Sequence, residues 1–350
     1  MKRSLLLGRE LRNNGPMKFV RGMELLNANG DIDTSSLGYQ YTIQTTTQIR
    51  AQVIHQKFYK VAPADFMDVV IGTGAWMEDI KTNLVYDAAG DFESGVIGVG
   101  QGPSQIATVD VGTAPKTARI ATWAKGYQYT TPEIQKALAA NNWDVVSSKM
   151  EALKRNWDLG IQKIAFLGRK TDLTDFPGFL TSPDVNSNTG VITQLISTMS
   201  TSAFQALVAT ILDTYFENSN DTQMPNMFAI PMKDMLGLGS ATSPDFPIET
   251  KLSYLLKVFR EVTGNADFQI RGLAYADQAR NAGYVSTLGK NRYVLYNKNL
   301  ETLKMDIPVD FTLSPAGTAN NFQWQGVGAG QFTGCVFYRP AEALYFDWAS

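Results

Sequence analysis

The sequence has very little of the chemistry on which most enzymes and secreted proteins depend. Its 350 residues include one cysteine, Cys335, and one histidine, His55. A single cysteine excludes a disulfide framework within the chain and a zinc site built from several cysteines, although it leaves open a bridge between two chains. A single histidine excludes a multi-histidine metal site, and no Gly-X-Ser-X-Gly motif supplies a nucleophile to partner it. We therefore expect no catalytic, cofactor-binding or metal-binding residues, and we interpret the chain as a non-enzymatic protein.

Long apolar runs and a strong net charge are also missing. No uncharged apolar stretch approaches the roughly 20 residues that cross a bilayer, so we expect no contact with a membrane. The first residues, MKRSLLLGRELRNNGPMK, hold only three successive leucines, whereas a signal peptide needs about 7 to 15 apolar residues. Charged residues make up 18% of the chain and the formal net charge is -2, which argues against sequence-specific DNA reading. With 44% hydrophobic residues, the chain should fold and expose a surface that favours association.

Two glycine-rich stretches and one acidic stretch look like ligand loops only at first sight. GVIGVGQG and GVGAG lack the Gly-Lys-Ser/Thr of a phosphate loop, and neither lies between a predicted strand and a predicted helix. Asp31 and Asp33, in NGDID, lack the remaining ligands and the glycine of a calcium loop. These stretches therefore predict no cofactor.

The part of the chain before residue 142 divides into three predicted segments. Residues 1–50 are polar and rich in Gln and Thr, which predicts an extended arm that is ordered only against another surface. Residues 81–125 contain short β-prone pieces broken by Gly and Pro, which predicts a long, exposed hairpin. Thr131, Pro132 and Glu133 are typical of a helix start, and Asn141 marks where that short helix should end.

Residues 143–167 predict one long amphipathic helix. About 25 residues at about 1.5 Å each make a rod of roughly 37 Å, and Gly168 can cap its end. Apolar residues recur at steps of three or four, so that they share one face. The residues of this predicted face are Trp143, Val146, Met150, Leu153, Trp157, Ile161, Ile164 and Leu167. Such a helix must lie on a sheet or on another lobe.

Residues 185–300 alternate between helical and strand patterns, which predicts a compact α/β lobe. The predicted helices cover SAFQALVATILDTYFEN and IETKLSYLLKVFREVTG, and the predicted strands cover 227–230, 268–273 and 292–296. Residues 301–350 read as strands that close the chain, and they could return to the sheet beneath the long helix.

In this order, the segments resemble the HK97-like major capsid proteins of tailed bacteriophages, and particularly a branch whose C-terminus ends much like YRPAEALYFDWAS. The resemblance covers residues from about 50 to 350. It implies an α+β, HK97-like capsid fold with an N-terminal arm (1–50) and a P domain (51–184). That P domain would include an extended β-hairpin, the E-loop (about 81–125), and the spine helix (about 143–167). An α/β A domain (185–300) and C-terminal strands that return to the P domain (301–350) would follow.

The resemblance also implies a function. Copies of the chain would form hexamers and pentamers of an icosahedral head that encloses double-stranded DNA, with no reaction and no cofactor. The implied assembly residues are the spine-helix face from Trp143 to Ile164, together with Asp91, Phe92 and Lys116 in the E-loop. Portal, scaffolding and cement proteins are the implied partners, and packaged DNA would be contacted non-specifically. The protein would be assembled in the host cytoplasm and located in the virion.

Three other interpretations stay open on the sequence alone. An encapsulin-type compartment uses the same fold to hold cargo enzymes. A phage module that binds glycans or proteins is suggested by the Thr/Asn-rich composition and by aromatic residues such as Trp324. An enzyme of an unrecognised type would have to depend on His55 or on a pair of carboxylates.

Overall fold

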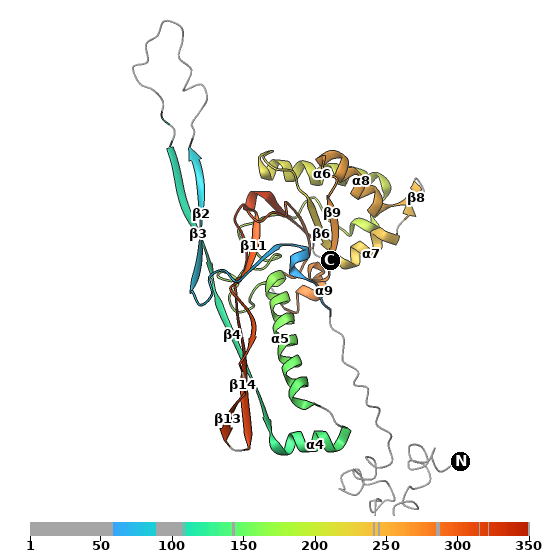
Figure 1. Cartoon of the computed structure of the whole chain (residues 1–350). Coiled ribbons are helices and arrows are strands. Elements are labelled where there is room, and N and C mark those ends of the chain that lie inside the picture. Colours follow the sequence, from blue (N-terminus) through green and yellow to red (C-terminus); the bar gives the residue numbers. More distant parts are fainter. Residues whose placement is uncertain are drawn as a thin grey trace, which may run out of the picture. The chain divides into compact units, whose positions relative to one another are not determined.

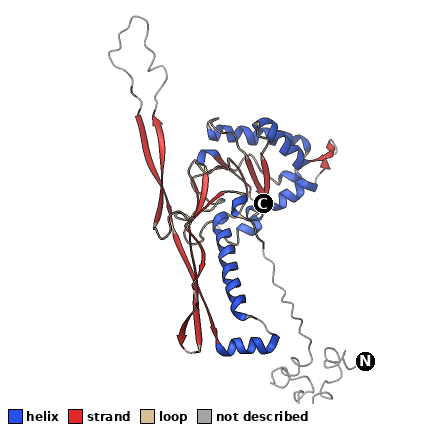
Figure 2. Cartoon of the chain, in the orientation of Figure 1, coloured by secondary structure: helices blue, strands red, loops and turns tan. Residues whose placement is uncertain are grey.

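The computed structural model describes residues 59–88, 108, 110–141, 144–240, 242–243, 246–284, 288–314, 316–320 and 322–348. The predicted arm, His55, and the predicted assembly residues Asp91, Phe92 and Trp143 lie outside these ranges. Helices and strands are mixed along the described chain (Figure 2). Contacts divide the chain into two compact units. The small unit contains Tyr59 and the described parts of Tyr127–Glu151 and Ala316–Gln325, and the large unit contains those of Lys60–Gly126, Ala152–Pro315 and Gly326–Ser350.

A five-stranded sheet organises the large unit. Its order is β5 (Asn186–Asn188), β16 (Ala343–Trp348), β10 (Asn291–Tyr296), β6 (Met227–Pro231) and β9 (Gln269–Leu273). In β10, Tyr293 and Leu295 face one hydrophobic cluster, whereas Val294 and Tyr296 face another. Because both faces are buried, the central strands read as continuous apolar runs and not as alternating ones.

Three helices pack on one face of this sheet (Figure 1): α6 (Thr201–Ser219), α7 (Met232–Ser240) and α8 (Lys251–Thr263). α6 confirms the helix predicted over SAFQALVATILDTYFEN, and its buried apolar residues are Phe204, Leu207, Val208, Ile211, Leu212 and Tyr215. α8 lies within the second predicted helix; its Leu255 and Phe259 side chains are buried, whereas Val262 is exposed. The sequence pattern missed α7, whose nine residues include two glycines.

The other face of the sheet packs against the end of α5 (Val145–Leu167) and a three-stranded sheet. That sheet has the order β1 (Asp68–Ile71), β11 (Leu303–Ile307), β15 (Cys335–Phe337). Phe166 of α5 packs edge-on against Phe66 and Phe179 and stacks on Tyr275. The smaller described elements are β7 (Thr242–Ser243), β8 (Phe246–Thr250), α9 (Gln278–Asn281) and short 3-10 turns at Pro63–Asp65, Ile196–Thr198, Ala274–Ala276 and Pro340–Glu342.

A long antiparallel hairpin is formed by β2 (Asp79–Ala88) and β3 (Asp110–Arg119), which pair along all ten residues of each strand. The structure therefore contains a hairpin where residues 81–125 predicted one, but its second strand ends at Arg119 and not at residue 125. Residues from Ala121 onward belong to β4 (Ala121–Thr130), which pairs with β14 (Gln323–Phe332). The physical reason is local, because Trp123 of β4 packs against Trp157 of α5 and not along β2. β14 also pairs with β12 (Val309–Leu313) and β13 (Gly317–Asn320).

The predicted long helix is present as α5, preceded by α4 (Thr131–Asn141). α5 begins at Val145, two residues after the predicted start at Trp143. Asp144 explains this start, because its Oδ1 accepts hydrogen bonds from the N–H groups of Val146 and Ser147, at 3.0 and 3.1 Å. Gly168 ends the helix at φ 74°, a left-handed conformation that favours glycine.

The last strand does not lie where we expected it. β12 and β14 do return to the sheet that contains β4, but β16 pairs with β10 in the five-stranded sheet. A buried ion pair fixes this register, since Arg292 lies opposite Asp347 and contacts it at 2.6 Å through both Nε and Nη2. Arg292 also donates to the carbonyl of Leu180 and lies over the Tyr345 ring. The C-terminal residues therefore complete the α/β lobe.

Replacement of Asp347 by Ala should lower the free energy of unfolding by about 3–5 kcal/mol, because it leaves the Arg292 charge buried without its partner. Urea unfolding of the unassembled subunit measures this loss. Asp65→Ala is the matched control, because it removes an exposed ion pair with Arg271 and should cost about 0–1 kcal/mol. Equal losses in the two variants would contradict the assigned place of β16.

Candidate assembly surface

α5 lies unusually close to β14, and two glycines allow this approach. The GVGAG stretch places Gly328 and Gly330 on the same face of β14. A Cβ at Gly328 would lie 2.7 Å from Cδ2 of Leu153, and a Cβ at Gly330 would overlap the Trp157 ring. Trp157 also contacts Trp123 of β4, with ring centroids 5.3 Å apart, and Phe332 of β14, at 6.2 Å. These glycines therefore serve helix packing, a role that the sequence pattern did not indicate.

The predicted face of α5 is only partly buried. Leu153, Trp157 and Ile161 are buried, whereas Val146, Met150 and Ile164 are half-buried. The buried members pack within this chain, where they hold α5 in place. A hollow of about 230 Å³ runs along α5 beside Trp123 and Gly160.

The small unit has its own set of aromatic and polar contacts. Tyr129 of β4 stacks on Trp324 of β14, with centroids 5.7 Å apart and planes inclined by 13°. Lys149 of α5 pairs with Glu133 of α4 at 2.6 Å and also donates to the carbonyl of Gln128. Trp324 thus packs on Tyr129 within its own chain.

The root of the hairpin is attached to the large unit. Ile80 and Leu84 of β2 and Ala118 of β3 pack against Val336 and Tyr338. Two ion pairs join β3 to the loop that follows α5: Lys116 to Asp184 at 2.7 Å, and Arg119 to Asp175 at 2.9 Å.

Beyond this root the hairpin has little cover within the described chain. The first six residues of β3 are all exposed. Val85 of β2 is 63% exposed and Val111 of β3 is 55% exposed. Lys116, one of the three predicted assembly residues in the hairpin, therefore belongs to the attached root. The exposed part of β3 is residues 110–115.

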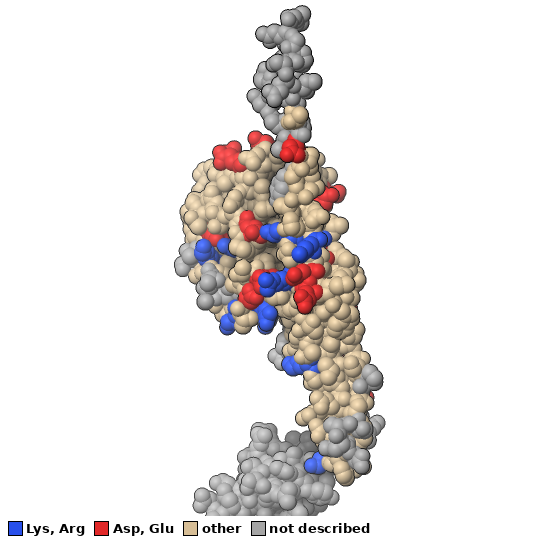
Figure 3. All heavy atoms as spheres, turned by 90° about the vertical axis from the view of Figure 1, so that its left-hand side faces the viewer, with Lys and Arg blue, Asp and Glu red and all other residues tan. Residues whose placement is uncertain are grey.

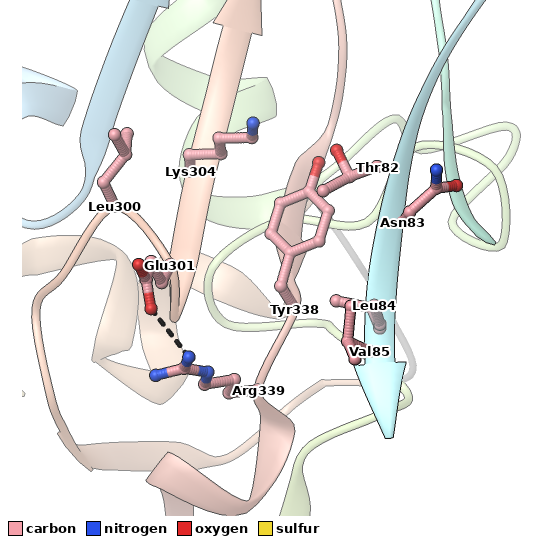
Figure 4. A pocket seen from close by; sticks show the side chains of 9 residues that line it. All are labelled: Thr82, Asn83, Leu84, Val85, Leu300, Glu301, Lys304, Tyr338 and Arg339. Atoms are coloured by element: carbon pink, nitrogen blue, oxygen red, sulfur yellow. Dashed lines mark ion pairs between the residues drawn. The ribbon is translucent and has the colours of Figure 1, made fainter. Parts of the chain in front are cut away.

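A groove of about 510 Å³ runs between the hairpin and the body of the large unit (Figure 4). We call it the hairpin groove; it is lined by Thr82, Asn83, Leu84, Val85, Leu300, Glu301, Lys304, Tyr338 and Arg339. Arg339 pairs with Glu301 at 2.6 Å, and Lys304 Nζ lies 5.0 Å from the centre of the Tyr338 ring. Burial raises the pKa of the Tyr338 hydroxyl. Burial also raises the pKa of Asp306, and the nearby positive charge of Lys304 partly offsets that rise.

Acidic and basic side chains lie close together on the face shown in Figure 3, and most of the remaining described surface there is neither acidic nor basic. This agrees with the low charged fraction of 18%. A surface of this kind costs little to desolvate when it meets another protein surface.

The described residues contain no group of three or more metal-ligating side chains, and none of their helices is long and apolar enough to cross a membrane. Cys335 is fully buried and unpaired, and burial raises the pKa of its thiol. A bridge from Cys335 to a second chain would therefore require the core to open.

Comparisons with known proteins agree with this arrangement. A family model described as "Major capsid protein" matches residues 97–348. A chain from the capsid of Myoviridae phage XM1 superposes with a TM-score of 0.70 at 14% identity, covering 87% of this chain and 97% of that one. Chains from Mycobacterium phage Bobi and Gordonia phage Cozz give TM-scores of 0.54 and 0.51 at 10% and 12% identity, covering 89% and 94% of this chain and 98% and 99% of theirs. No curated relative matches.

Gly330→Ala should destabilise the subunit by about 1–3 kcal/mol, because its new Cβ must displace the Trp157 ring. Gly160→Ala is the matched control in α5, where a Cβ would meet nothing within 4 Å. It should stabilise the subunit by about 0.5–1 kcal/mol, since alanine restricts the unfolded chain more than glycine does. Thermal unfolding compares the two variants, and a harmless Gly330→Ala would refute the close contact.

Proposed function

The chain belongs to the major capsid protein family, and we propose that copies of it form the hexamers and pentamers of an icosahedral shell that encloses double-stranded DNA. As a major capsid protein with the HK97-like fold it is a structural component of the virion capsid and not an enzyme. The family model covers residues 97–348, which include α5, the five-stranded sheet and the C-terminal strand.

The exposed hairpin is the observation that best supports assembly from copies. A two-stranded ribbon is marginally stable in water unless something packs on it. Beyond its root, β2 and β3 carry exposed apolar side chains such as Val85 and Val111 and have little cover in their own chain. A neighbouring copy would supply the missing surface, and a head-to-tail contact of this kind forms a ring when the rotation between copies closes.

We also propose how the fold divides in the shell. The E-loop is the β2–β3 hairpin, and Asp91 and Phe92, which lie outside the described residues, would contact a neighbour. Lys116 would fix the angle of the hairpin through its ion pair with Asp184. The spine helix is α5, with Trp143 just before it, in a P domain of residues 51–184.

The A domain is residues 185–300 together with β16, because that strand pairs with β10. The proposed A domain thus includes the last strand, whereas the resemblance implied that all of residues 301–350 return to the P domain.

Further partners follow from the same proposal. Portal, scaffolding and cement proteins would bind the shell, and assembly would take place in the host cytoplasm. A formal net charge of -2 provides no strong basic field, so DNA would be confined by the shell and contacted without sequence preference.

Shortening the hairpin tests this proposal. Residues 86–112 are replaced by Asn-Gly, which joins the paired residues Val85 and Thr113 in a tight turn. The removed described residues contribute no member of the buried clusters, so the melting temperature of the unassembled subunit should change little.

Negative-stain microscopy should show closed shells for the full chain and dispersed subunits for the shortened one. If the full chain stays monomeric under all assembly conditions, the proposed function is wrong. Shells of normal size from the shortened chain would show that the hairpin is not required.

A further inference from the structure

The loop between β1 and β2 presents large apolar side chains to solvent. We call residues 72–78 the Trp76 loop. Trp76 is 69% exposed and Met77 is 63% exposed, although tryptophan and methionine are usually buried. Ile71, which precedes the loop, is also exposed. Nothing in the described chain covers this patch, which is typical of an interaction site.

The Trp76 loop is held in a fixed and strained shape. Trp76 has φ 63°, a left-handed conformation that is rare for a bulky residue and costs about 1–3 kcal/mol. Its N–H donates to Oε1 of the buried Gln331 at 2.7 Å, and the Gln331 amide donates in turn to Thr122. Gly72 and Gly74 also have positive φ values. A strained loop that is fixed by a buried side chain, and yet exposes an indole ring, is preorganised to bind a partner.

Two carboxylates lie beside the apolar side chains of the Trp76 loop. Glu78 ends the loop, Asp79 begins β2, and both are exposed. Neither carboxylate forms an ion pair among the described residues. A complementary surface would therefore offer an apolar pocket with a cation at its edge.

The hairpin groove has these properties. Leu84, Val85 and Leu300 provide apolar walls, and Val85 and Leu300 are themselves exposed. Lys304 forms no ion pair within the described chain. The Tyr338 hydroxyl points toward Thr82 in Figure 4.

We propose that the Trp76 loop of one copy docks into the hairpin groove of a second copy, with Trp76 and Met77 against Leu300 and Val85, and Glu78 or Asp79 against Lys304. The volume of about 510 Å³ is in the range of pockets that hold drug-sized ligands, so an indole ring fits. Trp76 does not line the groove of its own chain. The loop and the groove are different surfaces, so the contact is heterologous, the type of contact that generates a ring when the rotation between copies closes.

This inference rests on the proposed function, because a shell is what places many copies side by side. It adds a specific pair of surfaces to that function. A failure of the proposed function can be distinguished from a failure of this contact, because the full chain can form shells whether or not the Trp76 loop docks into the hairpin groove.

Cysteine crosslinking tests the contact directly in assembled particles of the full chain. One variant carries Met77→Cys and a second carries Leu300→Cys, and the two are co-assembled and treated with a short bismaleimide. The native Cys335 is fully buried and should not react. We expect covalent dimers from the mixture, and a ladder of higher multimers from a chain that carries both cysteines.

Leu236→Cys on α7 replaces Met77→Cys in the control, because Leu236 is similarly exposed, at 68%. The control pair should give no dimer. Shells that form normally but give no crosslink at 77 and 300, or give equal crosslinking in the control pair, overturn the inference while leaving the proposed function standing.

A charge exchange separates docking from a merely structural role. Glu78→Lys with Asp79→Lys, and separately Lys304→Glu, should each raise the subunit concentration needed for assembly by about threefold to tenfold. Combining all three changes should restore assembly toward the wild-type value, because the pair is re-formed with its signs reversed. Additive damage in the combined variant contradicts the contact.

Trp76→Ala should raise the same concentration by about tenfold or more, because buried tryptophans are often the residues that dominate an interface. Leu236→Ala is the matched control and should leave assembly unchanged. Circular dichroism of each variant before assembly confirms that it is folded, and a folded Trp76→Ala chain that assembles like wild type refutes the role of Trp76.

Discussion

The packing of α5 against β4 and β14 is the contact on which the interpretation of this chain depends. Trp157 lies over Gly330 and beside Trp123, and Leu153 lies over Gly328. A Cβ at Gly330 would overlap the Trp157 ring, and a Cβ at Gly328 would crowd the Leu153 and Phe311 side chains. The same helix carries Phe166 into the core beneath the five-stranded sheet. A single helix thus packs on β14 and also enters the main hydrophobic core.

Those exposed parts explain how a protein without catalytic chemistry can have a function. The root of the hairpin is fixed by Lys116 and Arg119, whereas its strands extend beyond the cover of their own chain. The Trp76 loop is held by Gln331 and displays an indole ring to solvent. Both features are costly for an isolated subunit and favourable for one that is surrounded by copies of itself.

Much of the fold could be predicted from the sequence because its strongest signals are local. The periodicity of α5 and α6, the capping role of Gly168 and the exposed hairpin all follow from patterns within short windows. The start of α5 was misplaced by two residues because the capping by Asp144 competes with the apolar pattern at Trp143. The partner strand of β16 could not be predicted, because the sequence of an apolar strand does not specify which strand it pairs with. Trp76 was overlooked for a similar reason, because an isolated tryptophan in a glycine-containing loop gives no sign of whether it is buried.

The central claim is that surfaces left uncovered by one chain are covered by others, and hydrogen exchange of backbone amides tests it most directly. Exchange is compared between unassembled subunits and assembled particles. The account predicts that amides of β2, β3 and the Trp76 loop become strongly protected on assembly, whereas the buried strands β6 and β10 change little. Equal exchange of the hairpin and the Trp76 loop in both states would contradict it.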